Sequence, residues 1–317
     1  MKVSVWMTAY NHEKYLARCL DSVLMQKTDF DFDIILGEDC SEDKSREIAM
    51  EYQKNYPDKI KLFLPEKNIG MMQMDVATHR LCKGKYLALL NGDDYWTDKN
   101  KLQRQADFLD SDSGISMCYH RTCVIDEING TTWETEFTGE KNNLPVEKLF
   151  MGFNPIMTSS VMCRNFESLP EWYVEMPFGD MPLYLMLTET GKIGYIERTM
   201  GVYRIHNSGN WQGDSLIKNL IKDILYYKLV DEKFKFKYSL HIKKILAKRF
   251  FDLITLSLKD NNKEIAEMYY YKLQEVGFEN LNYNKNNITM LYEIIFDNSD
   301  KLNFPELFDR EIEWKLS

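Results

Sequence analysis

The first 110 residues alternate two patterns, and this alternation constrains the fold more than any other feature. Short segments rich in β-forming residues lie at 3–7, 32–36, 60–64 and 85–90. After each of them, apolar residues recur at the spacing of a helix, over 12–26, 43–55, 71–82 and 101–109. Such alternation predicts an α/β fold with a mainly parallel central sheet and helices on both faces.

The rest of the chain is less regular. Segment 115–125 is predicted as a strand, followed by a hairpin turn at Asn129-Gly130, and a further strand is predicted at 158–163. Segment 177–190 opens with turn residues and continues as an amphipathic helix. From 215 to 275 the pattern is helical and contains no proline. We therefore predict a catalytic α/β domain over 1–214 and a helical extension over 215–317.

Charge and composition exclude several classes of protein. The net charge is −9, which argues against a nucleic-acid-binding protein, because such a protein needs a basic face. None of the six cysteines forms a CxxC pair, so a zinc site is not supported. The longest apolar run, 86–90, is too short to cross a bilayer. With Met1-Lys2 leading directly into a strand pattern and no export signal, these features predict a cytoplasmic protein with reduced thiols.

Polar clusters follow three of the predicted strands. They are Thr8-Ala9-Tyr10-Asn11, Glu38-Asp39-Cys40-Ser41-Glu42-Asp43 and Asn91-Gly92-Asp93-Asp94-Tyr95-Trp96. Each alone fits a solvated turn or a helix cap. In a parallel sheet, however, the carboxyl ends of the strands meet at one edge, where ligands bind. We therefore expect the three loops to form one site.

The acidic residues of these loops suggest two roles. Adjacent carboxylates such as Asp93 and Asp94 repel each other unless a cation or a donor compensates them, so a divalent cation bound there can bridge a diphosphate. Asp39 can only accept hydrogen bonds, which suits the N–H of uracil, thymine or guanine and not cytosine. The alternative for Asp39 is a cap for the next helix.

The motifs together resemble family 2 glycosyltransferases, which have the GT-A fold. The resemblance covers about residues 1–211 and includes a bacterial subgroup's Gly-Asp-Asp-Tyr-Trp form of the DXD motif at 92–96. Residues 3–26 resemble the family's opening, and 38–43 its second nucleotide motif. Asn68-Ile69-Gly70 and 83–86 resemble the stretch before the DXD motif. Phe178-Gly179-Asp180 resembles the loop of the catalytic base, and 203–207 a later motif.

The resemblance implies a role for each matching residue. Asp180 is the implied catalytic base, Asp93 and His206 are implied metal ligands, and the implied nucleotide-binding residues are Thr8, Ala9, Tyr10, Asn11, Glu13, Asp39, Asn68, Gly70, Asn91 and Gly92. Supporting roles fall to Asp94, Trp96 and Arg204. For Trp96, the options are stacking on a sugar ring or packing beneath the metal loop.

One position departs from the family pattern. The first residue of the DXD motif is usually acidic, and here it is Asn91. An amide can accept a hydrogen bond from a ribose hydroxyl, but it brings no charge to a metal. We therefore expect Asp93 to be the main protein ligand, with Asp94 in support. For His206, a structural role remains the alternative to ligation.

The predicted function is an inverting glycosyltransferase of hexosyltransferase type that depends on Mn²⁺ or Mg²⁺. The preferred donor is a UDP-sugar, with dTDP- and GDP-sugars as alternatives. The acceptor is a glycan, as in polysaccharide biosynthesis, a lipid-linked glycan or a protein. Two other classes compete with this prediction. One is a non-catalytic sugar-nucleotide-binding or scaffold protein of the same fold. The other is a nucleotidyltransferase, which would need a glycine-rich, basic loop that 8–13 lacks.

The extension carries a basic and aromatic segment at 218–251. Lysines and arginines outnumber acids there, and tyrosines and phenylalanines lie among them. Such helices can bind an anionic membrane surface, which would place the protein peripherally at the inner face of the membrane. The alternative is an ordinary packed helix with a solvated basic face. The oligomeric state does not follow from the sequence.

Overall fold

The computed structural model describes residues 1–137, 144–150, 154–209, 215–281 and 285–296 of the chain. These fall into two compact units, one of Met1–Leu149 with Phe153–Gly213, and one of Phe150–Gly152 with Asp214–Ser317. The predicted domain boundary at residue 214 lies outside the described residues.

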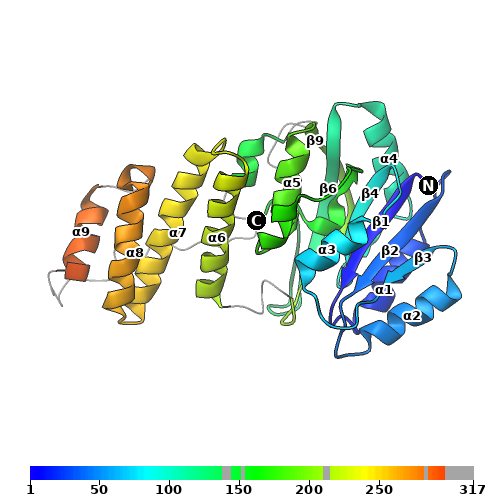
Figure 1. Ribbon diagram of the computed structural model, residues 1–317, viewed down its shortest axis with the longest axis horizontal. Helices are drawn as coiled ribbons and strands as arrows, with labels where there is room; N and C mark the ends of the chain where they lie inside the picture. Colours follow the sequence, from blue (N-terminus) through cyan, green and yellow to red (C-terminus); the bar gives the residue numbers. More distant parts are fainter. Residues whose placement is uncertain (138–143, 151–153, 210–214, 282–284, 297–317) are drawn as a thin grey trace. The chain divides into compact units, whose positions relative to one another are not determined.

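The first unit begins with a regular alternation of strands and helices. The elements are β1 (Val3–Ala9), α1 (Leu16–Leu24), β2 (Phe32–Glu38), α2 (Ser45–Asn55), β3 (Ile60–Phe63), α3 (Met71–His79), β4 (Tyr86–Asn91), β5 (Tyr95–Trp96) and α4 (Lys101–Ser111). All eight segments predicted before residue 110 are present. Strands β1 to β4 lie side by side (Figure 1), and β1 is parallel to both β2 and β4.

The second half of this unit completes the sheet with antiparallel and long strands. Its elements are β6 (Ile115–Asp126), β7 (Thr131–Glu134), the 3-10 helices η1 (Val146–Phe150), η2 (Thr158–Ser160) and η3 (Glu171–Glu175), β8 (Met162–Arg164), α5 (Asp180–Thr188) and β9 (Lys192–Ile205). Within the described residues the strand order is β3-β2-β1-β4-β8-β6-β9-β5, and β7 pairs with β6. The predicted hairpin at Asn129-Gly130 is confirmed as the β6–β7 turn.

Two expectations for this half were wrong, and one long strand was not predicted. Segment 158–163 is not a single strand, because Thr158–Ser160 forms the 3-10 helix η2 before β8 begins. Helix α5 lies within 177–190 as expected, but it is buried on most sides, so its pattern is not amphipathic. The long strand β9 was not anticipated at all.

Side chains of the parallel strands alternate between two covered faces of the sheet. Val3, Val5 and Met7 belong to the main core together with buried residues of α1 and α4. On the opposite face, Trp6 donates a hydrogen bond from its indole to Thr78 of α3 at 2.7 Å. Each fully buried aliphatic side chain stabilises the fold by about 1.5–3 kcal/mol. The core therefore fixes the strand ends from which the polar loops start.

The second unit is helical, with α6 (Leu216–Lys233), α7 (Ser239–Lys259), α8 (Lys263–Val276), the 3-10 helix η4 (Phe278–Asn280) and α9 (Lys285–Phe296). A buried ion pair joins α6 to α7, where Arg249 contacts Asp223 at 2.8 Å. No helix in the described part of the chain is long and apolar enough to span a membrane.

The aromatic residues of 218–251 lie mostly inside this unit. Tyr226, Tyr227, Tyr238, Phe250 and Phe251 are buried, whereas Phe236 is exposed. Most of these rings are thus core residues, which is a correction to their interpretation as a membrane-facing set. The exposed residues of the segment are mainly lysines.

Candidate functional site

Strand register brings the three polar loops together. Ala9 at the end of β1 pairs with Glu38 of β2, and Thr8 pairs with Asn91 of β4. Backbone hydrogen bonds extend this pairing into the loops, because Gly92 donates to Thr8 at 2.9 Å and Asp39 to Ala9 at 3.0 Å. The loops after β1, β2 and β4 therefore begin side by side, as expected for the carboxyl edge of a parallel sheet.

Two imidazoles meet the Asp93 carboxylate. Nε2 of His206 lies 3.1 Å from Asp93 Oδ2, and Nε2 of His12 lies 3.6 Å from the same oxygen. His206 is buried just after β9, and its Nδ1 lies 2.9 Å from Ser208 Oγ. Burial raises the pKa of Asp93, but His12 and His206 outweigh burial and hold that pKa below its usual value. Asp93 is therefore an ionised, accessible acceptor.

His12 was missed by the sequence reasoning, although its neighbours Asn11 and Glu13 were selected. A lone histidine in a polar loop gives no periodic signal. Its position is fixed by its backbone N–H, which donates to Ser45 Oγ at 2.7 Å. Gly92 is required beside it, since a Cβ there would lie 2.8 Å from His12 Nδ1 and 2.9 Å from Ala9 Cβ.

Asp94 lies behind Asp93 and is fully buried. Its Oδ1 accepts a hydrogen bond from the backbone N–H of Arg204 at 2.9 Å, and the Arg204 guanidinium donates to the Asp93 carbonyl at 2.6 Å. The guanidinium also lies over the rings of Tyr15 and Tyr95. Burial, and then the Asp93 charge, raise the pKa of Asp94 well above its usual value. The two carboxyls therefore differ, because the histidines lower the pKa of Asp93 while burial raises the pKa of Asp94.

Trp96 packs beneath this loop. It is 1% exposed, its indole donates to the Ser159 carbonyl at 2.9 Å, and the Lys101 ammonium lies 4.0 Å from its ring centroid. A ring so enclosed has no free face for a sugar. Of the two roles expected for Trp96, the structure supports packing beneath the loop and not stacking on a sugar ring.

Asp39 holds the loop before α3. Its Oδ1 and Oδ2 accept hydrogen bonds from the backbone N–H groups of Ile69 and Gly70, both at 2.8 Å, and Asn68 donates to its carbonyl at 3.2 Å. The N-cap position of α2 is Lys44, so Asp39 does not cap that helix. Each carboxylate oxygen has a further lone pair, so Asp39 can still accept from a ligand.

The remaining residues of the first loop tie it to the second. Asn11 Oδ1 accepts from the Glu42 N–H at 3.0 Å, and Glu13 Oε2 accepts from the Lys44 N–H at 3.1 Å. Glu13 is exposed, and its hydrogen bond with Lys44 stabilises the contact between the two loops. Tyr10 is 38% exposed beside them. Asn11 and Cys40 both have positive φ, of 56° and 55°, a strained conformation that often marks functional loops.

Asp180 is the first residue of α5, and the N-cap position is Gly179. Its Oδ1 accepts a hydrogen bond from the Met181 N–H at 2.8 Å, and its Oδ2 accepts one from Asn154 Nδ2. Burial raises the pKa of Asp180 above its usual value. Asn154 was not selected from the sequence, and it lies 26 residues away with no motif to identify it.

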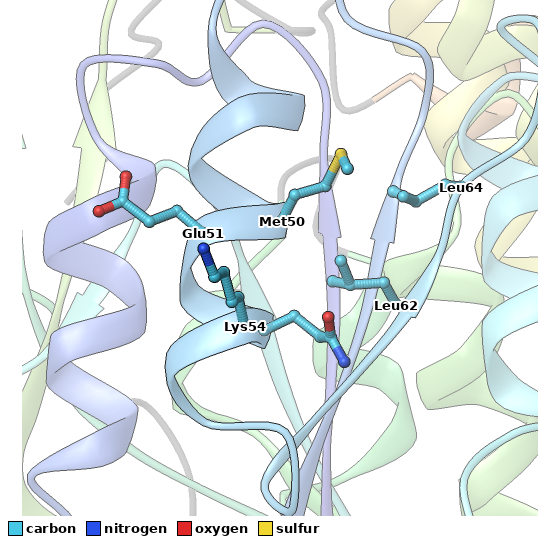
Figure 2. Close-up of a pocket in the computed structure, with 6 residues that line it drawn as sticks. Met50, Glu51, Lys54, Leu62 and Leu64 are labelled. Carbon is cyan, nitrogen blue, oxygen red and sulfur yellow. The ribbon is translucent and has the colours of Figure 1, made fainter.

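Two further observations concern a cluster of metal ligands and a pocket. Within the described ranges, no group of three or more His, Cys, Asp or Glu is arranged to enclose a metal ion. A pocket between α2 and β3 involves none of the predicted residues (Figure 2). Its lining consists of Met50, Glu51, Gln53, Lys54, Leu62 and Leu64.

Comparison with known proteins identifies the family of the chain. The sequence model described as Glycosyl transferase family 2 matches residues 4–167. An uncharacterized protein of Mycobacterium tuberculosis strain H37Rv is 34% identical over 213 residues, covering 66% of this chain and 60% of that protein. An uncharacterized glycosyltransferase of Nostoc is 28% identical over 221 residues, covering 66% of each. The chain thus spans about 60% of the length of the mycobacterial relative.

A solved structure supports the fold. Staphylococcus aureus TarS 1-349 in complex with UDP-GlcNAc has a TM-score of 0.53 at 16% sequence identity, covering 90% of this chain and 93% of that chain. The likeness confirms the predicted GT-A fold with a helical C-terminal region.

Proposed function

The chain belongs to glycosyl transferase family 2, and on that premise we propose that it transfers a sugar from a nucleoside diphosphate sugar to a hydroxyl, with inversion at the anomeric carbon. The observation that carries this proposal is the meeting at Asp93 of the loops that follow β1, β4 and β9, because the Asp93 carboxylate contacts both His12 and His206. The test is release of nucleoside diphosphate from candidate donors with and without Mn²⁺. A binding or scaffold protein would bind donor and release nothing.

For the donor, we propose that the nucleotide binds along the loops after β1, β2 and β4. Asp39 accepts hydrogen bonds only, so it selects a base with an N–H at its edge, and we propose a UDP-sugar ahead of dTDP- and GDP-sugars. Support comes from the two bonds that Asp39 accepts from Ile69 and Gly70, which hold its carboxylate in one orientation. Asn91 is the last residue of β4 and Gly92 follows it, and we propose that these two residues contact the ribose and the diphosphate.

A divalent cation fits the residues present. Carboxylate and phosphate oxygens are ligands that Mn²⁺ and Mg²⁺ prefer, so Asp93 would hold the ion together with donor phosphates, with His206 as the proposed second protein ligand. His12 Nε2, 3.6 Å from the same Asp93 oxygen, would orient that carboxylate and would not itself bind the ion. When bound, the cation would neutralise charge on the leaving diphosphate. Asp94 and Arg204 hold the backbone and orientation of Asp93.

For the acceptor, we propose Asp180 as the base. A neutral hydroxyl is a weak nucleophile, so a carboxylate takes its proton as the oxygen bonds to the anomeric carbon and the bond to the diphosphate breaks. The raised pKa of Asp180 makes its carboxylate a stronger base. Asn154 and the Met181 N–H each engage one oxygen, which fixes the direction of the group.

We propose that 1–214 forms the catalytic domain and 215–317 a helical extension. Within the family, we assign the chain to the bacterial subgroup that has the Gly-Asp-Asp-Tyr-Trp form of the DXD motif. The acceptor is a glycan, a lipid-linked glycan or a protein hydroxyl. We propose a cytoplasmic enzyme that contacts anionic membrane through 218–251. Exposed lysines of that segment, Lys235, Lys237, Lys243, Lys244 and Lys248, support this contact.

A further inference from the structure

A second carboxyl group lies next to the backbone that leads into Asp180. Asp75 of α3 approaches Gly179, where an added Cβ would lie 2.8 Å from Asp75 Oδ2 and closer still to the Tyr173 hydroxyl oxygen. Only glycine leaves room for both groups. Asp75, Tyr173 and Gly179 therefore form one packed contact immediately before the proposed base.

The hydroxyl of Tyr173 links the other two residues. Its oxygen lies 2.9 Å from the Gly179 carbonyl oxygen and 3.3 Å from Asp75 Oδ2. A tyrosine hydroxyl has one hydrogen to donate, and a carbonyl oxygen can only accept. Gly179 is the nearer of the two acceptors, and a hydrogen donated to it leaves none for Asp75. The contact with Asp75 is then a hydrogen bond only if Asp75 is protonated and donates to the hydroxyl oxygen.

The surroundings of Asp75 favour that proton. Burial raises the pKa of Asp75 to about 7; Tyr173 works against this rise, and the Asp180 charge adds to it. Among the described residues, the elements packed against α3 bring no positive charge to Asp75. Strand β1 presents Trp6 to α3, β2 presents Gly37, and η3 presents Tyr173. The charge that does act on Asp75 is the negative one of Asp180.

We propose that Asp75 is a positioning residue that carries a proton, and that through Tyr173 it holds the Gly179 carbonyl and so the start of α5 in place for Asp180. This rests on the proposed role of Asp180 as base. When Asp75 loses the proton, its carboxylate competes with Gly179 for the one hydrogen of Tyr173. Turnover then falls as pH rises through the titration of Asp75, while donor binding at the separate strand-end loops stays the same.

The first test is the pH dependence of kcat in the full-length enzyme. Asp75→Asn supplies an N–H that donates to Tyr173 at every pH, so it should remove the alkaline fall in kcat. We expect the parent to lose roughly tenfold in kcat from its maximum to about pH 8.5, as for a slightly misplaced catalytic group. Asp75→Asn should lose little over that range, with the donor KM unaltered. Asp58→Asn, at an exposed turn, is the matched control and should follow the parent.

Tyr173→Phe tests whether Asp75 acts through the Tyr173 hydroxyl or has only a structural role. Removal of the hydroxyl should lower kcat and abolish the alkaline fall, and adding Asp75→Asn to this variant should change the pH profile no further. Residues that act through one contact give such non-additive effects. Superimposable pH profiles for the parent and Asp75→Asn would overturn the positioning role.

The second test needs no turnover. A carboxyl whose folded pKa lies above its unfolded value binds a proton more tightly when folded, so it lowers stability as pH rises from about 4 to about 7. The melting temperature of the parent should therefore drop relative to Asp75→Asn over this range, and Asp58→Asn should not show the difference. Parallel curves for all three proteins would overturn the proton on Asp75. A parent that releases nothing from any nucleotide sugar overturns the proposed function and the positioning role with it, while the melting curves still decide the protonation.

Discussion

Replacing Asp180 by Asn tests the proposed base most directly, because the structure separates its chemical role from its hydrogen bonds. In the parent, Oδ1 accepts from the Met181 N–H at 2.8 Å and Oδ2 accepts from Asn154 Nδ2. An Asn side chain keeps the first bond through its oxygen. Its amide nitrogen then faces the Asn154 nitrogen, and two donors cannot bond. Asn154 cannot simply turn over, because its Oδ1 accepts from the Ile156 N–H at 2.9 Å.

The expected magnitudes follow from these contacts. A donor left unpaired in a buried position costs about 1–3 kcal/mol, and Asn154 is only half-buried, so its loss lies near the lower end of that range. We expect Asp180→Asn to unfold about 1 kcal/mol more easily, on the order of one hydrogen bond. Loss of a general base should reduce kcat by about 100- to 10,000-fold. Donor affinity should stay unchanged.

A second substitution distinguishes the two losses. When Asp180→Asn is combined with Asn154→Asp, the carboxylate introduced at position 154 accepts from the amide introduced at position 180 and keeps the bond to the Ile156 N–H. The double variant should therefore regain the stability of the parent while remaining inactive, since the carboxylate has moved off α5. Stability is measured by denaturant unfolding, and kcat by release of nucleoside diphosphate. Turnover within a few-fold of the parent in either variant would refute Asp180 as the base.

Further predictions concern the metal site and the extension. Asp93→Asn should remove metal-stimulated turnover, whereas Asp94→Asn should be milder, because burial and the Asp93 charge raise the pKa of Asp94 and Asn keeps its bond to Arg204; titration of activity with Mn²⁺ measures both, and a near-normal Asp93→Asn enzyme would contradict the site. His12→Gln should weaken apparent Mn²⁺ affinity by roughly 10- to 100-fold, like loss of an outer partner; unchanged affinity would leave His12 a loop residue. The full chain should sediment with anionic vesicles at low salt and less as salt rises; equal binding to neutral vesicles, or by a Lys243→Glu, Lys244→Glu variant, would refute the electrostatic contact.

The parallel half of the fold was predictable because its signals are local. Each of β1 to β4 is a short apolar run followed by a helix of regular spacing, and buried strands of this kind have few alternatives. Asp93 and Asp39 were identifiable for the same reason, since polar residues directly after such strands must lie at one sheet edge. The hydrogen bonds of Asp39 to Ile69 and Gly70 were not, because they join segments about 30 residues apart.

The residues missed are those whose partners are distant in sequence. Asp75 lies on a helix whose sequence shows no motif, and its proposed positioning role depends on Tyr173, 98 residues further on. Asn154 has the same relation to Asp180. The basic and aromatic segment was misleading for another reason. Composition cannot tell which face of a helix is buried, so the rings of Tyr226 and Phe250 counted toward a surface although they belong to the core.

The parallel register of β1 with its neighbours also has a consequence for engineering the molecule. Every residue proposed to bind the nucleotide is at or beyond the carboxyl ends of β1, β2, β3 and β4, so the turns that lead into the amino ends of the parallel strands carry none of them. The turn before β3 contains exposed Pro57 and Asp58, and exposed turn tips tolerate insertions well. A fluorescent tag or affinity peptide can therefore be inserted between Pro57 and Asp58, reporting on the enzyme from the edge of the sheet opposite its chemistry.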